Sequence, residues 1–188
     1  LYEMFFNRAK QQPDSAFIWT KKENEWKSHS WGQIANQVKI IASALTQRGI
    51  TAGARVAILS ENRLEWIITD LAIMSIGAIS VPLFTTYTQT DITYLLSHSG
   101  ARAIICSNSE LTAIAETAAQ DSPDCYLMVI MEQSKLLHHS HNLAIVNWED
   151  LIKEGEKASS NKIISSLPMS VDDVCCIIYT SDGEEKPK

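Results

Sequence analysis

Short apolar runs alternate with segments of helical periodicity along most of the chain. The apolar runs have the length of strands and lie at 56–59, 81–84, 103–106, 126–131 and 174–179. Apolar residues recur at helical spacing in the segments 64–79, 90–97, 110–120 and 148–156. Near-continuous apolar strands that alternate with helices are typical of a parallel sheet covered on both faces. The pattern therefore predicts an α/β fold with a mainly parallel sheet and helices on both faces.

The first fifty residues follow a different pattern, which begins with the amphipathic stretch LYEMFFNRAKQ. Residues 16–20 and 26–30 then flank the polar connector KKENE, whose length and central Asn24 predict a small β-hairpin. Residues 31–48 repeat apolar positions at helical spacing between Ser30 and Gly49. We expect a helix, a hairpin and a second helix in residues 1–50, followed by strand–helix repeats in 51–188.

Charge and composition exclude some classes of function. The formal charge is −6 and the pI is about 5.3, and no cluster of Lys and Arg occurs, so we expect no nucleic-acid partner. The apolar stretch 66–84 is broken by Asp70, Gly77 and Pro82, which favours a buried helix over a membrane span. The cysteines show no C-x-x-C spacing and the first residues do not resemble a signal peptide, so we expect a cytoplasmic protein.

Two groups of residues could suggest other chemistry. His138, His139 and His141 lack a second ligand cluster with matching spacing, so a solvated loop is favoured over a metal site. Cys175 and Cys176 lie side by side in an apolar run with no basic neighbour, which favours buried small hydrophobes over reactive thiols. We therefore predict no metal site and no catalytic cysteine.

Tryptophans and nucleotide-binding motifs are two further candidate features of the sequence. Packing and cross-strand contacts explain the tryptophans more simply than an aromatic binding surface does. They are Trp19, Trp26, Trp31, Trp66 and Trp148. The chain contains neither G-x-G-x-x-G after a strand nor the Walker pattern G-x-x-x-x-G-K-[ST], which argues against a Rossmann dinucleotide site and a P-loop NTPase.

The run 174–179 leads directly into the polar sequence TSDGEEKPK. Hydroxyls, a Gly and Lys side chains after a core strand are one way in which α/β proteins bind phosphate at the carboxyl edge of a sheet. Hydroxyls and backbone N–H groups donate to phosphate oxygens, and Lys supplies a positive charge. A solvated turn has the same composition, so the residues alone leave both interpretations open.

The sequence YTSDGEEKPK resembles the phosphate-loop signature of the adenylate-forming superfamily, [YF]-T-S-G-[ST]-T-G-x-P-K-G. The residues that match it without a gap are Tyr179, Thr180, Ser181, Pro187 and Lys188. Upstream, residues 30–58 and 56–107 are similar to the long-chain fatty acyl-CoA synthetase branch. The resemblance covers essentially the whole chain.

Four positions depart from this signature: Asp182, Gly183, Glu184 and Glu185 stand where the family has G-[ST]-T-G. Acidic side chains in this loop repel a triphosphate, and the missing glycines remove backbone freedom that close approach of phosphate usually requires. The loop with this sequence is therefore predicted to bind ATP weakly.

The resemblance implies a fatty acid–CoA ligase that uses ATP, Mg²⁺ and CoA. The fatty acid carboxylate would attack the α-phosphate of ATP, and the CoA thiol would then displace AMP from the acyl-adenylate. Thr180, Ser181 and Lys188 would help to orient the ATP phosphates. The family's other active-site motifs and its C-terminal domain would follow Lys188, so residues 1–188 would be part of one N-terminal AMP-binding domain without catalytic residues.

The isolated chain is accordingly expected to be inactive. The alternative is a non-catalytic α/β structural or interaction module, a pseudoenzyme, which the acidic loop favours. The fatty acid preferred, the oligomeric state and peripheral membrane association of the protein that contains this chain stay open at this point.

Overall fold

The computed structural model describes residues 2–132, 142–159, 170 and 172–180. Its helices and strands are α1 (Tyr2–Gln11), β1 (Ala16–Lys22), β2 (Glu25–Ser30), α2 (Trp31–Gln47), β3 (Arg55–Leu59), α3 (Leu64–Ser75), β4 (Ile79–Leu83), α4 (Gln89–Ser99), β5 (Ala101–Cys106), α5 (Ser109–Gln120), β6 (Leu127–Ile130), β7 (Ala144–Asn147) and α6 (Trp148–Ser159). None of the helices in these ranges is long and apolar enough to cross a membrane.

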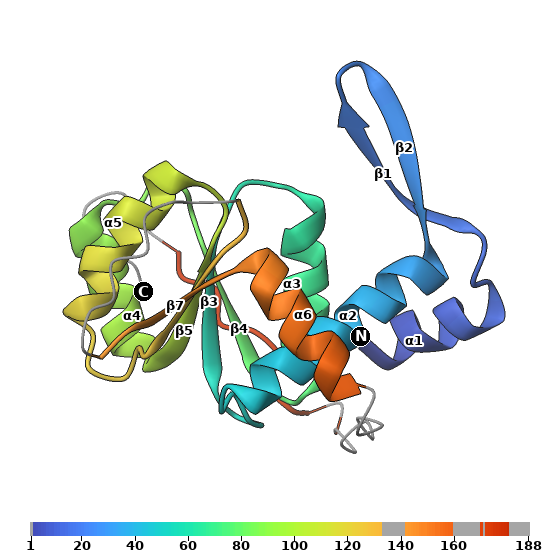
Figure 1. Ribbon diagram of the computed structural model, residues 1–188. Helices are drawn as coiled ribbons and strands as arrows, with labels where there is room; N and C mark the ends of the chain where they lie inside the picture. The colour runs from blue at the N-terminus through green and yellow to red at the C-terminus, as the bar shows by residue number, and fades with distance from the viewer. Residues whose placement is uncertain (1, 133–141, 160–169, 171, 181–188) are drawn as a thin grey trace.

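A parallel sheet forms the centre of the molecule. Its five strands lie in the order β4-β3-β5-β6-β7, and every neighbouring pair is parallel. Helices α2, α3 and α6 cover one face, and α4 and α5 cover the other (Figure 1). This arrangement confirms the predicted α/β fold. The short strand β7 was not predicted.

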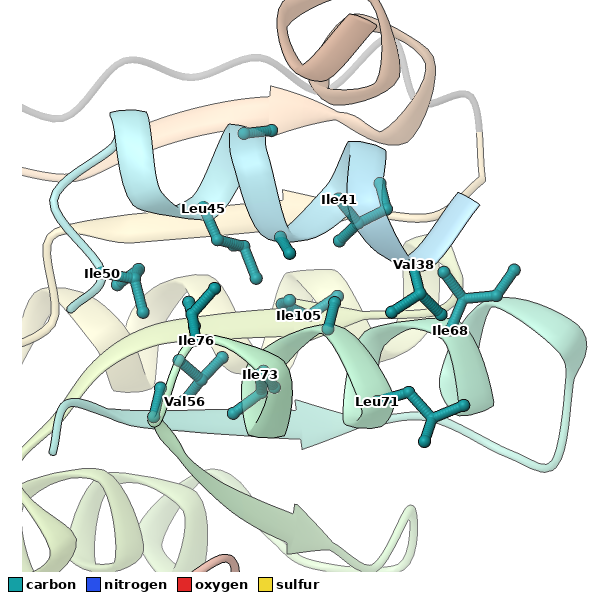
Figure 2. Packing of buried hydrophobic residues seen from close by; sticks show 14 of the residues in the cluster. Val38, Ile41, Leu45, Ile50, Val56, Ile68, Leu71, Ile73, Ile76 and Ile105 are labelled. Atoms are coloured by element: carbon teal, nitrogen blue, oxygen red, sulfur yellow. The ribbon is translucent and has the colours of Figure 1, made fainter. Parts of the chain in front are cut away.

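Side chains of each strand alternate between two cores. In β3, Val56 and Ile58 belong to the core under α2 and α3, whereas Ala57 and Leu59 belong to the core under α4 and α5. Figure 2 shows the first core, where side chains from α2 and α3 meet Val56 and Ile105. Both faces of the sheet are buried, which explains why the strands read as continuous apolar runs.

Helix α3 is shorter than the predicted 64–79. It ends at Ser75 because Gly77 adopts a left-handed backbone with φ of +71°. The Gly77 N–H donates to the carbonyl of Met74 (3.0 Å), and the Ala78 N–H donates to that of Ile73 (3.1 Å). These two bonds form a Schellman termination. The chain can therefore turn directly into β4 at Ile79.

The β1–β2 hairpin projects from the body of the molecule (Figure 1). Its turn is Glu23 and Asn24, with φ of 49° and 67°, the left-handed pair of a two-residue hairpin turn. At the base of the hairpin, Phe17 and Trp31 lie with ring centroids 3.9 Å apart. Trp19 and Trp26 are exposed on the two strands of the hairpin, so core packing does not explain them. For Trp26 the structure shows a cross-strand contact instead, with Nζ of Lys21 5.9 Å from the centroid of its ring.

Candidate functional site

The carboxyl ends of β3, β5 and β6 form the edge at which open α/β sheets usually bind ligands. Polar residues follow these strands: Ser60 and Glu61 after β3, Ser107 and Asn108 after β5, and Glu132 after β6. The chain leaves β3 for α3 on one face and β5 for α5 on the other. The carboxyl edge shared by β3 and β5 is therefore the expected position of a ligand site.

Arg63 joins the loops at this edge. Its Nε donates to Oε2 of Glu65 (2.8 Å), and its Nη1 donates to Oε1 of Glu132 (3.2 Å). Glu61 lies 3.7 Å from the same Nη1 and accepts a hydrogen bond from the Ser107 hydroxyl. The loops after β3, β5 and β6 are thus tied together by side chains.

The electrostatics of this cluster do not suit phosphate. The hydrogen bond to Glu65 raises the pKa of the Arg63 guanidinium. Burial raises the pKa of Glu61, but the hydrogen bond from Ser107 and the charge of Arg63 outweigh it, and the net direction is downward. Glu61, Glu65 and Glu132 surround the guanidinium of Arg63. The cluster is therefore acidic and internally paired, and we interpret it as structural.

The segment that contains the phosphate-loop motif lies on the outer side of β4. The Ser80 N–H donates to the carbonyl of Cys175 (3.0 Å), and the Ile177 N–H donates to that of Ser80 (2.8 Å). These bonds form one isolated parallel bridge, between Ser80 and Cys176. The prediction of a full strand over 174–179 is therefore wrong in extent, although the direction is parallel as expected.

The two neighbouring cysteines also differ from the prediction. Cys175 is exposed and Cys176 is half-buried, so Cys175 is not a buried small hydrophobe. The reason is their position, because the backbone of this segment pairs with the sheet at its edge, beside β4. The buried cysteines are Cys106 and Cys125. Burial raises the pKa of both thiols, that of Cys125 to about 12, so neither is a reactive thiolate.

Tyr179, the first residue of the motif, is only 4% exposed. Its hydroxyl lies 2.8 Å from Nδ1 of His98, on α4. The imidazole also stacks on Tyr94 at a centroid distance of 5.3 Å. Burial, with a further contribution from Tyr94, raises the pKa of Tyr179, and the Ser99 side chain opposes this only in part, so the hydroxyl stays protonated.

The structure thus places only part of the predicted phosphate site. Thr180 is exposed and follows directly on the buried Tyr179. Ser181 and Lys188, and the departing positions Asp182, Gly183, Glu184 and Glu185, lie outside the described residues, as do His138, His139 and His141. His98, which sequence reasoning missed, gave no signal of its own because its partner lies 81 residues away.

Metal-ligand clusters and cavities are two other kinds of candidate site. The part of the chain that the structure describes contains no group of three His, Cys, Asp or Glu side chains that could hold a metal. A cavity of about 710 Å³ lies at α1 and α2, lined by residues that include Phe6, Asn36 and Lys39. No residue of 172–180 lines this cavity. Neither feature therefore adds a ligand contact to the motif segment.

Comparison with known proteins matches the family model described as "AMP-binding enzyme" to residues 5–188. The chain is 27% identical to fatty acyl-CoA synthetase A of Dictyostelium discoideum over 196 residues, which cover all of this chain and 28% of that protein. It is 27% identical to the peroxisomal long chain acyl-CoA synthetase 6 of Arabidopsis thaliana, over 87% of this chain and 23% of the relative. The chain thus spans about a quarter of the length of these relatives.

Solved structures show the same fold. The anthranilate CoA ligase AuaEII in complex with anthranoyl-AMP superposes with a TM-score of 0.82 at 18% identity, over 99% of this chain and 33% of that one. Coronafacic acid ligase from Pectobacterium brasiliense gives a TM-score of 0.79 at 20% identity, over 95% of this chain and 33% of that one. At this identity the likeness establishes the arrangement of helices and strands.

Proposed function

Because this chain belongs to the AMP-binding enzyme family, we propose that the full-length protein, the natural protein containing these 188 residues, is an AMP-forming acyl-CoA ligase. The observation that carries the proposal is the family match over residues 5–188, which includes the phosphate-loop motif. Residues 1–188 form part of its N-terminal AMP-binding domain.

The reaction has two steps that balance without another reactant. A carboxylate oxygen of the acid attacks the α-phosphorus of ATP, and the bond to pyrophosphate breaks. The CoA sulfur then attacks the acyl carbon, AMP leaves, and the thiol proton passes to solvent. Thr180 and Ser181 donate hydroxyl hydrogen bonds to the β- and γ-phosphates, and Lys188 supplies a positive charge. Their contribution is positioning and electrostatic stabilisation.

Mg²⁺ offsets phosphate charge when it is bound with ATP. The described residues do not offer a group of acidic, His or Cys side chains placed to hold it. We therefore assign no residue of this chain to Mg²⁺ and derive no step through the ion.

The acid is proposed to be a long-chain fatty acid. The support is that relatives from Dictyostelium and Arabidopsis that match at least 87% of this chain are named fatty acyl-CoA or long chain acyl-CoA synthetases. A long-chain fatty acid–CoA ligase of Mycobacterium bovis is 32% identical over 60% of this chain.

We propose a cytoplasmic location for the full-length protein.

The test is fatty-acid-dependent exchange of labelled pyrophosphate into ATP. It compares the full-length protein as it stands with a variant carrying Asp182→Gly, Gly183→Thr, Glu184→Thr and Glu185→Gly. We expect exchange to be much faster in the variant, because three carboxylates no longer repel the triphosphate and two glycines return. The 188-residue chain alone should show no exchange.

The second candidate function is a non-catalytic α/β module, which the acidic residues at 182, 184 and 185 favour. Absence of exchange in both full-length proteins, with either loop and with fatty acids of short to long chain, would overturn the ligase proposal and leave this candidate. Equal exchange with both loops would retain the ligase and refute the charge argument. A shorter or aromatic acid as the preferred substrate would refute the long-chain assignment only.

A further inference from the structure

We propose that His98 is a positioning residue that holds Tyr179 and thereby sets where the phosphate loop begins at Thr180. The inference rests on the proposed function for its effect on ATP. The contact itself rests on the hydrogen bond of 2.8 Å between the Tyr179 hydroxyl and Nδ1 of His98. This bond joins the first residue of the motif to helix α4, 81 residues upstream.

Apart from Tyr179, the motif segment is attached by the half-buried Ile177, which packs against the core under α4 and α5, and by two backbone hydrogen bonds. Among residues 172–180 that the structure describes, Tyr179 is the one buried side chain, and Val174 and Ile178 are 59% and 66% exposed. Two backbone hydrogen bonds join the segment to Ser80, one from Ser80 to Cys175 and one from Ile177 to Ser80. Both lie upstream of the motif. The position of Thr180 therefore depends strongly on how Tyr179 is held.

His98 lies on a helix with capped ends and a buried face. Helix α4 begins with a capping box between Thr88 and Asp91 and ends at Gly100, whose φ of +62° is left-handed. Ile92, Leu95 and Leu96 of α4 are fully buried. Tyr94, one turn before His98, stacks on the imidazole at an interplanar angle of 28°. The ring is thus held in place before it meets Tyr179.

The chemistry of the pair suits a fixed contact. A neutral imidazole with its proton on Nε2 accepts the phenol hydrogen at Nδ1, and the other tautomer donates from Nδ1 to the phenol oxygen. Either form gives the buried Tyr179 hydroxyl a hydrogen-bond partner on α4, in addition to the neighbouring Ser99 side chain. Loss of a partner by a buried hydroxyl is costly. Packing alone would hold the ring of a phenylalanine equally well, so the hydroxyl and Nδ1 are the groups to test.

The experiment compares His98→Asn and His98→Leu in the full-length protein, with Tyr179→Phe as a third variant. Asn places an amide atom on the carbon that carries Nδ1 in histidine, so it retains a polar partner for Tyr179, whereas Leu fills space without one. Both substitutions remove the ring stacked on Tyr94. Comparison of His98→Asn with His98→Leu therefore separates the effect of losing the hydrogen bond from the effect of losing the ring.

The first readout is hydrogen exchange of the peptide covering 174–180, in which the Ile177 N–H is protected by Ser80. Loss of one such hydrogen bond corresponds to about 2- to 10-fold faster exchange. We expect this in His98→Leu and Tyr179→Phe, and near-native exchange in His98→Asn. The double variant His98→Leu with Tyr179→Phe should be no faster than His98→Leu alone.

The second readout is kinetic and uses whichever loop sequence at 182–185 is active in the exchange assay. His98→Leu should raise the KM for ATP about 2- to 10-fold and leave the KM for the fatty acid unchanged. Unchanged exchange of 174–180 in His98→Leu, or equal effects of Leu and Asn, would overturn the anchoring. Faster exchange of 174–180 with an unaltered KM for ATP would overturn the role in positioning the loop. Absence of activity with both loops would instead refute the proposed function, while the exchange data would still decide whether His98 holds Tyr179.

Discussion

Gly155 of helix α6 lies against the backbone of Ile40 in helix α2. A Cβ placed on Gly155 would lie 2.1 Å from the carbonyl oxygen of Ile40 and 2.8 Å from its carbonyl carbon and Cγ2. The nearest obstacle is backbone, so no side-chain rotation can relieve it. We predict that Gly155→Ala destabilises the packing of α6 on α2.

The sign of this effect is informative because two terms oppose each other. Alanine in a helix interior is favoured over glycine by about 1 kcal/mol. Ordinary contact begins at 3.4 Å, so the helices would have to separate by about 1 Å to accept the methyl group. Overpacking of this kind costs about 1 to 3 kcal/mol or more. Separation would also strain the ion pair between Arg48 and Glu154, whose atoms Nη2 and Oε1 are 2.6 Å apart. Because the obstacle is backbone, we expect an overpacking cost of about 2 to 3 kcal/mol and therefore a net loss of about 1 to 2 kcal/mol.

The assay is urea denaturation of the full-length protein combined with hydrogen exchange of peptides from α2 and α6. Glu156→Ala is the matched control, since Glu156 is the next residue in α6 and is exposed. The control should change the free energy of opening by less than about 0.5 kcal/mol. If Gly155→Ala instead stabilises α6, as helix propensity alone predicts, then α2 and α6 do not approach as closely as described.

Two other substitutions test α3. Leu71→Ala should lower the free energy of unfolding by about 2 to 5 kcal/mol, because Leu71 is buried in the core shown in Figure 2. A loss below about 0.5 kcal/mol in urea denaturation would place Leu71 at the surface. Asp70→Asn should stabilise the protein at pH 7, because burial raises the pKa of Asp70 above its ordinary value of 3.8, although the nearby Ser80 hydroxyl partly opposes the shift. A raised carboxyl pKa contributes stability at low pH that is lost as pH rises through the folded-state pKa. Thermal unfolding from pH 7 down to about 4 should therefore show the advantage of Asn shrinking, and a constant difference would refute the explanation.

The sequence by itself determined the class of fold and the order of its parts. Apolar residues occupy nearly every position of β3 and β5 because both faces of these strands are covered. This pattern can be recognised in the sequence alone. The hairpin turn could be predicted from Asn24, whereas the phosphate-binding role of Thr180 stays a prediction. Such features depend on neighbours within a few residues, so local composition encodes them.

The tertiary structure decided the contacts between distant segments. His98 meets Tyr179 across 81 residues, and Arg48 meets Glu154 across 106, which no local pattern specifies. Gly155 reads in the sequence as a weak helix former, and only the approach of Ile40 explains it. The run 174–179 has the composition of a buried strand, but its position outside β4 leaves Cys175 exposed. The apolar composition of a segment indicates that it can be buried in a sheet. Whether it is buried depends on which strands and helices lie beside it.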